Sequence, residues 1–114
     1  MIAVMRIRRL SEGTVNRIAA GGHYGWPHVH GAEVRDPSLY AEMPAGLSPV
    51  PQFHGLGGHV APLSIRFLRN QADARLNGTA LVAEHGSWNR REKAGYRIIR
   101  LILEGSTARE EMFL

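Results

Sequence analysis

The side chains best suited to chemistry gather in one short segment, residues 85–91, whose sequence is HGSWNRR. The Arg90 guanidinium can fork onto a planar carboxylate, the Trp88 ring can stack on a conjugated ring, and the Asn89 amide can hydrogen-bond a carbonyl edge. The segment follows a short apolar run, so we expect it where a strand ends and a loop begins, a common position for binding groups. These residue types are compatible with a loop that binds a planar, anionic molecule.

A purely structural interpretation of the same segment is the alternative. In that case the loop fills the interior of the fold, Trp88 packs between neighbouring sheets, and Arg90 pairs with Glu84 or Glu92.

Six histidines in 114 residues raise the question of a metal site. His28 and His30 would lie on one side of an extended segment, and Glu33 or Asp36 would add a carboxylate ligand. Ordinary loop histidines are the competing interpretation, because Pro27 argues against a regular strand at this point. The chain has no cysteine, which excludes a disulfide framework, a thiolate metal site and a cysteine nucleophile.

Two familiar enzyme signatures do not fit this sequence. Ser87 lacks the glycine two residues later that a nucleophile elbow needs, since Asn89 stands there, and this argues against a serine hydrolase. The segment GLGG at residues 55–58 lacks the spacing of a dinucleotide-binding loop and does not precede a helix. It is predicted to be a tight turn.

Short strands must position these groups in the second half of the chain. The predicted strands, each bounded by turn residues, span residues 60–68, 79–84, 96–103 and 110–114. The first alternates, with Ala61, Leu63, Ile65 and Phe67 on one apolar face. The third is apolar on both faces, as expected of a strand that is covered on each side. Strands joined in sequence make an antiparallel meander, the unit of a propeller blade.

The first half of the chain is less regular. Residues 11–13 are predicted to form a turn and residues 14–18 a short strand. Residues 19–58 are predicted to be loop, because they hold five of the six prolines and no sustained period. We therefore expect a partial blade and long loop over residues 1–58 and a β-meander blade over residues 59–114, both parts of one incomplete domain.

Composition excludes several classes of protein. A hydrophobic fraction of 44% argues against intrinsic disorder. The net charge is +4, but no block of like charges reaches the length of a nucleic-acid-binding tail, so no nucleic-acid partner is expected. No apolar run approaches the roughly 18 residues of a membrane span, so none is expected.

Three segments resemble the pyrroloquinoline-quinone-dependent sugar dehydrogenases, and most closely their glucose/sorbosone or pyranose dehydrogenase branch. They are residues 22–27 (GHYGWP), residues 58–63 (GHVAPL) and residues 81–90 (LVAEHGSWNR), the last followed by Gly95-Tyr96-Arg97. The resemblance implies an all-β, six-bladed β-propeller that oxidises an aldose or related hydroxyl, with hydride transfer to the quinone. It covers about one four-stranded antiparallel blade and the long loop before it, so the chain is expected to be a fragment that is incomplete alone.

The resemblance also implies roles for particular residues. His59 precedes the segment where the family places a cofactor-contacting loop. Trp88, Asn89 and Arg90 lie where the family presents groups to the quinone, with Arg90 facing its carboxylates. His85 is the candidate catalytic residue, since an imidazole can accept the hydroxyl proton as hydride leaves. Calcium is compatible with this family, but no calcium ligands can be identified here.

The expected partners are a sugar substrate, an electron acceptor, and either the missing blades or further copies of the chain. By resemblance such a protein works in the periplasm or is secreted. The alternative from another class is a noncatalytic β-meander module that binds a carbohydrate or a protein.

Overall fold

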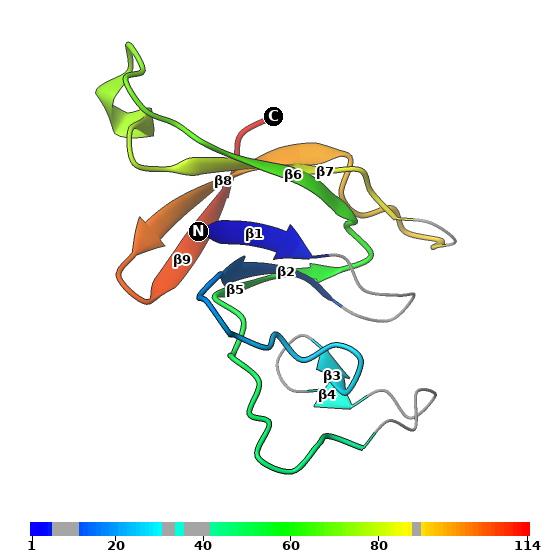
Figure 1. Ribbon diagram of the computed structural model, residues 1–114. Coiled ribbons are helices and arrows are strands. Elements are labelled where there is room, and N and C mark those ends of the chain that lie inside the picture. The colour runs from blue at the N-terminus through cyan, green and yellow to red at the C-terminus, as the bar shows by residue number, and fades with distance from the viewer. Residues whose placement is uncertain (6–11, 31–33, 36–41, 88–89) are drawn as a thin grey trace.

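The computed structural model is built from antiparallel strands, and Figure 1 shows two sheets stacked face to face with a small hairpin beside them. The structure describes residues 1–5, 12–30, 34–35, 42–87 and 90–114. Within these residues there is no α-helix, and the one helical turn is the 3-10 helix η1, Ala74–Leu76. The all-β fold class predicted from the sequence is therefore confirmed.

The first sheet has three strands in the order β1-β2-β5. These strands are β1 Ile2–Met5, β2 Glu12–Arg17 and β5 His54–Gly58. The two-stranded hairpin consists of β3 Val29–His30 and β4 Val34–Arg35. The short strands β3 and β4 lie within residues 19–58, which were expected to be loop. Two further expectations for this half were wrong, because residues 12–13 lie in β2 instead of a turn and residues 54–58 form a strand.

Close approach and pairing explain both differences. A Cβ atom at Gly13 would lie 2.7 Å from Cδ of Pro62, which belongs to the other sheet. The glycine in β2 therefore allows a close approach between strands instead of forming a turn. β5 pairs with β2 despite its three glycines, and its Leu56 side chain is buried in the core. Pairing with β2 and burial of the Leu56 side chain thus stabilise a strand where the glycines predicted a turn.

The second sheet has four strands in sequence order, which confirms the predicted meander. The strands are β6 Pro62–Phe67, β7 Ala80–Glu84, β8 Arg97–Glu104 and β9 Thr107–Met112. A bulge between Pro62 and Ser64 interrupts the alternation in β6 and leaves Leu63 60% exposed. Leu63 was expected on the apolar face of this strand. Of the four residues expected there, Ile65 and Phe67 are the two that pack against the core.

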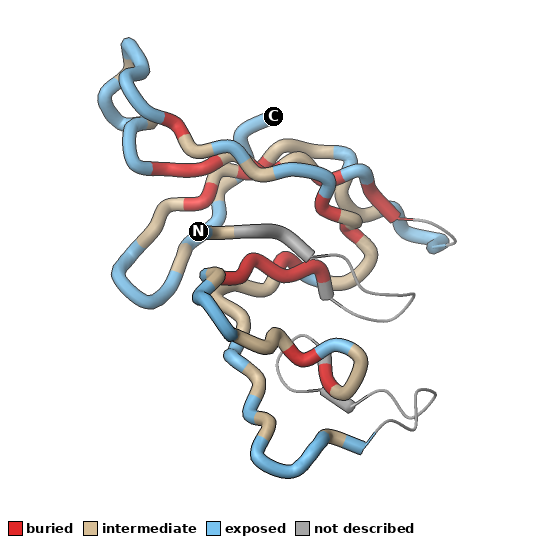
Figure 2. The backbone as a smooth tube through the Cα atoms, viewed as in Figure 1, coloured by how far each residue is buried: buried red, intermediate tan, exposed pale blue. Residues whose placement is uncertain are grey.

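The core lies between the two sheets. Buried positions on β2 face buried positions on β7 and β8 in Figure 2. The core residues, contributed by both sheets, are Val15, Leu56, Val60, Ala80, Val82, Ile99 and Leu101. The sheets therefore form one packed unit, and burial of apolar surface between them is the main stabilising contribution.

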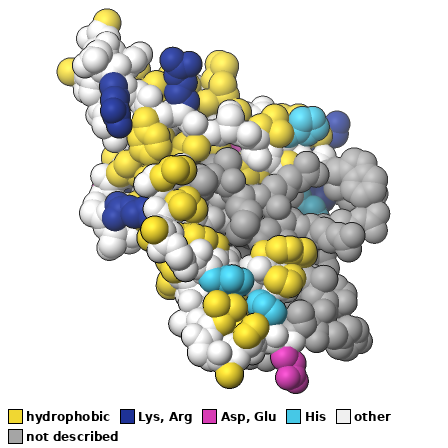
Figure 3. Space-filling model, in the orientation of Figure 1, with side chains coloured by type: hydrophobic (Ala, Val, Ile, Leu, Met, Phe, Trp, Pro, Cys, Tyr) yellow, Lys and Arg dark blue, Asp and Glu magenta, His cyan; other side chains and the backbone are white. Residues whose placement is uncertain are grey.

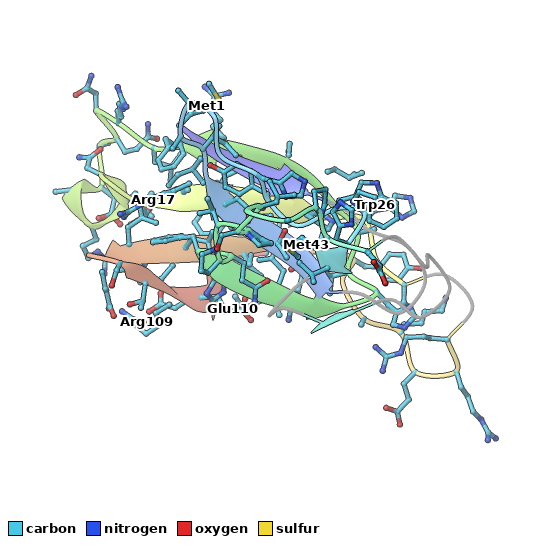
Figure 4. The ribbon with its side chains drawn as sticks, turned by 60° about the horizontal axis from the view of Figure 1, so that its bottom comes forward. Met1, Arg17, Trp26, Met43, Arg109 and Glu110 are labelled. Carbon is cyan, nitrogen blue, oxygen red and sulfur yellow. The ribbon has the colours of Figure 1, made fainter. Side chains whose placement is uncertain are left out.

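Among the described residues, no second layer covers the far face of the four-stranded sheet. Leu81, Ala83, Ile98 and Ile102 share this outer face, and each is only partly buried. β8 was expected to be covered on both sides, and in the chain it is fully covered only on the side of Ile99 and Leu101. Figure 4 shows the alternation on β9, where Glu110 points toward β5 and Arg109 points to the opposite side.

Polar contacts also join the sheets. Arg17 on β2 donates to the carbonyl oxygen of Gly105 in the β8–β9 turn, at 2.5 Å. Its guanidinium lies 4.5 Å from the centroid of the Phe53 ring. His54 on β5 lies 3.3 Å from Glu110 on β9, measured from Nε2 to Oε2.

Candidate functional site

Three chain segments meet at the end of the sheets where β5 ends, β6 begins, β7 ends and β8 begins. They are residues 59–61, 85–87 and 94–96. The amide of His85 donates to Ala61 O at 3.1 Å, and the amide of Gly86 donates to Val60 O at 3.0 Å. The loop that carries His59 and the loop that carries His85 are thus held together through their backbones.

The backbone at this end adopts unusual conformations. Among the described residues four non-glycines have positive φ, and three of them lie here: His59 at 65°, Ala61 at 47° and Tyr96 at 54°. The left-handed region costs a side-chain-bearing residue about 1 kcal/mol or more, and such strain gathers at functional sites. Tight packing maintains it, because a Cβ at Gly95 would lie 2.5 Å from Gly86 Cα.

The loop between β7 and β8 closes on itself at its base. Ser87 N donates to Ala94 O at 2.7 Å, and Ala94 N donates back to Ser87 Oγ at 3.0 Å. The Tyr96 hydroxyl donates to Ser87 O at 2.9 Å. Ser87 thus contributes its amide, its hydroxyl oxygen and its carbonyl oxygen to the closure of the loop.

Basic side chains occupy the tip of this loop. Arg90, Arg91 and Lys93 are exposed, with Glu92 as the one acid among them. Lys93 Nζ lies 5.7 Å from the centroid of the Tyr96 ring. On the face shown in Figure 3, the described Lys and Arg side chains are scattered among hydrophobic ones.

The predicted site residues are brought together only in part. His85 is exposed, and its ring centroid lies 6.3 Å from that of Tyr96. Among the described residues, no hydrogen bond or ring contact joins Arg90 to His59 or His85, so their convergence on one ligand stays a prediction. Trp88 and Asn89 lie outside the described residues.

Glu84 ends β7 on the inner face, and Arg97 beside it on β8 is its ion-pair partner. This corrects the alternative pairing of Glu84 with Arg90. The hydrogen bond to the Glu84 carboxylate is the main reason that the pKa of Arg97 is raised above its ordinary value. Charge at the base of the loop is thus neutralised locally, and Arg90 is left exposed at the tip.

The metal hypothesis falls largely on residues that the structure does not describe. The described residues contain no group of three or more His, Asp or Glu side chains placed to hold a metal ion. His23 Nδ1 accepts the amide hydrogen of Gly25 at 3.1 Å. The His30 side chain, Glu33 and Asp36 lie outside what the structure describes.

Tyr96 is the site residue that sequence reasoning missed. It was noted only within the segment Gly95-Tyr96-Arg97, without a role. A single tyrosine at the start of a strand gives no sign of its partners. The one feature of the sequence that could have indicated its role is Gly95 before it. Gly86 and Gly95, which lack side chains, allow the backbones of the two segments to touch.

Within the described residues, no helix is long and apolar enough to cross a membrane. This agrees with the expectation from hydropathy.

Comparison with known proteins gives a family and one relative. The family model described as TrAA12-like matches residues 49–112, from before β5 to the end of β9. An uncharacterized protein of Borreliella burgdorferi is 36% identical over 86 residues, which are 75% of this chain and 23% of that protein. The chain thus spans less than a quarter of that relative. No solved structure matches.

Proposed function

The chain belongs to the TrAA12-like family, and from the three loops at one end of its sheets we propose that it forms part of a sugar dehydrogenase. In this proposal the cofactor is pyrroloquinoline quinone, and the chain supplies part of the cofactor edge. The sequence motifs at residues 22–27, 58–63 and 81–90 support this proposal, because they resemble motifs of the quinone-dependent sugar dehydrogenases. The single observation that carries the proposal is that backbone hydrogen bonds hold the His59 loop against the His85 loop.

The side chains on these loops fit a polycarboxylate ring system. Arg90 and Lys93 are exposed cations on a loop with a fixed base, and charge-assisted hydrogen bonds to carboxylates are among the stronger polar contacts. Trp88 is proposed to stack on the ring and Asn89 to hydrogen-bond its carbonyl edge. When bound, the quinone supplies the hydride acceptor.

His85 has the chemistry for the accompanying proton transfer. As the sugar C–H bond gives up its hydride and the carbonyl forms, the hydroxyl proton needs an acceptor, and an exposed imidazole provides one near neutral pH. His59, on the neighbouring loop, is proposed to contact the cofactor.

The propeller is also part of this proposal. The face-to-face packing of two antiparallel sheets is how consecutive blades bury their surfaces. The half-buried apolar side chains on the outer face of the four-stranded sheet suit contact with a further blade.

A binding titration tests the proposal. The chain is titrated with pyrroloquinoline quinone at low and high salt while its amide NMR signals are followed. We expect shifts at residues 59–61 and 85–96, and weaker binding at high salt because the contacts are ionic. Arg90→Ala should lower the affinity by roughly tenfold or more, as expected for loss of a charge-assisted hydrogen bond.

Arg66→Ala is the matched control, since Arg66 is an exposed arginine on the outer face of β6. It should leave quinone affinity unchanged. Equal losses in the two variants, or no quinone binding by the wild-type chain, would contradict the proposal.

A noncatalytic carbohydrate-binding module is the second candidate, and an exposed aromatic ring favours it. Trp26 is 41% exposed and is labelled in Figure 4. An exposed tryptophan is a common platform for a sugar ring. Sugar-dependent shifts confined to residues 22–28 in the absence of quinone, and lost in Trp26→Ala, would favour this function.

A further inference from the structure

The Tyr96 ring lies against the backbone of the loop that carries His85. A Cβ atom added at Gly86 would collide with three ring carbons of Tyr96. Tyr96 stays 56% exposed, so burial of apolar surface explains little of the position of its ring. Tyr96 also has a left-handed backbone, with φ of 54°, which a tyrosine adopts only when its surroundings enforce it.

The Tyr96 hydroxyl completes the closure of the loop. Its proton goes to Ser87 O at 2.9 Å. Ser87 and Ala94 are joined by two more hydrogen bonds, so three bonds close the loop at residues 87 and 94–96. The exposed cations Arg90, Arg91 and Lys93 lie in sequence between the two sides of this closure.

We propose that Tyr96 is the positioning residue of this loop and sets the placement of Arg90 for an anionic ligand. The inference rests on the proposed function only where it takes the anionic ligand to be the quinone. Tyr96 is not a proton donor in the reaction, since the one hydrogen of its hydroxyl is already held by Ser87 O. Its effect on binding is exerted through the loop.

The test uses Tyr96→Phe, which keeps the ring and its packing on Gly86 but removes the hydrogen bond to Ser87. The first readout is amide hydrogen exchange at Ser87 and Ala94, whose N–H groups close the loop. We expect exchange there to become roughly fivefold faster, the effect of losing one hydrogen bond of ordinary strength. Exchange in the centre of β7 and β8 should not change.

Tyr24→Phe is the matched control. The Tyr24 hydroxyl accepts from Ala19 N at 2.7 Å and donates to Arg17 O at 2.8 Å, so it is an equally bonded tyrosine on a different loop. This variant should leave exchange at Ser87 and Ala94 unchanged. If Tyr96→Phe also leaves it unchanged, the inference is overturned.

The second readout is quinone affinity in a double-mutant cycle with Arg90→Ala. We expect Tyr96→Phe to weaken binding roughly fivefold in the wild-type chain and to have no effect once Arg90 is absent. An equal effect in both backgrounds, or none in the wild type, would overturn the link to Arg90. If the wild-type chain fails to bind quinone, the proposed function falls, while exchange still decides whether Tyr96 positions the loop.

Discussion

Arg97 donates its Nε hydrogen to Glu84 Oε2 at 2.7 Å across the β7–β8 pair, and the Glu84 side chain is fully buried. The other carboxylate oxygen, Oε1, has no hydrogen-bond partner among the described residues. The buried charge therefore depends on one arginine. Arg97 also lies 3.9 Å from Glu110, measured from Nη2 to Oε1, which links this pair to the contact between Glu110 and His54.

Removal of Arg97 should be costly. We expect Arg97→Leu to lower the free energy of unfolding by about 3 kcal/mol, because it leaves a buried carboxylate without a counterion. Chemical denaturation measures the change. The double variant Glu84→Leu/Arg97→Leu should lose less than the single one, since no buried charge remains.

The control for this prediction is an ion pair at the surface. Arg75→Leu breaks the pair with Asp73, and we expect a much smaller loss than for Arg97→Leu, because Arg75 is largely exposed and solvent screens the pair. Equal losses in the free energy of unfolding for Arg97→Leu and Arg75→Leu would mean that burial of Glu84 does not determine the cost of breaking its ion pair.

Gly86 should tolerate alanine much less well than Gly57. Both have positive φ, 110° and 82°, but only at Gly86 would the new Cβ meet the Tyr96 ring, while nothing lies within 4 Å at Gly57. Gly57→Ala should cost about 1 kcal/mol from backbone strain alone. Gly86→Ala should cost clearly more, and thermal unfolding of both variants provides the comparison. Similar losses would show that Tyr96 moves aside freely.

Stability at acidic pH should depend on Asp73. Its hydrogen bonds with Arg75 lower the pKa of the carboxyl to about 2. The folded-state pKa lies below the ordinary value of 3.8, so the charged carboxylate stabilises the fold above that pH, and this contribution is lost as the pH falls toward 2. Asp73→Asn should reduce the acid-dependent loss of stability over this range.

A direct titration accompanies that comparison. The side-chain carboxyl NMR signal of Asp73 should titrate near pH 2 in the folded chain. Glu42→Gln, which changes an exposed carboxylate in the loop before β5, should leave the profile as in the wild type. A titration of Asp73 near its ordinary value would refute the prediction.

The sequence predicted the strands of the second half well because alternation and turn residues are local properties. β6, β7 and β8 begin and end within about two residues of the predicted bounds. The displacement of Leu63 was not predictable, since the bulge arises from how β6 pairs with β7. The strand at residues 54–58 was missed for a related reason, because its pairing with β2 comes from a segment almost forty residues away in sequence.

For the candidate site, the motifs pointed to two loops that the structure brings together, but not to the contacts within them. His59 and His85 were identified from motifs, and the structure joins their loops through the backbone. The role of Tyr96 depends on a hydrogen bond to Ser87 and on contact with Gly86, which spacing alone does not reveal.

The isolated chain should bind the quinone without oxidising sugar. A propeller site takes groups from the loops of several blades, whereas the candidate site described above takes its groups from loops at one end of two packed sheets. With pyrroloquinoline quinone, calcium and glucose or sorbosone, we expect no sugar-dependent reduction of a dye. Robust turnover by a monomer would contradict this prediction and require a complete active site within these 114 residues.

The same chain should self-associate through the outer face of the four-stranded sheet, because partly buried apolar side chains there lack a second layer. Leu81→Glu tests this face. Leu81 lies directly between Arg66 on β6 and Arg100 on β8, so a glutamate at this position gains two cationic neighbours and the sheet should stay folded. Light scattering should show a larger mass for the wild type than for the variant. Equal masses, with unchanged circular dichroism, would show that association does not use this face.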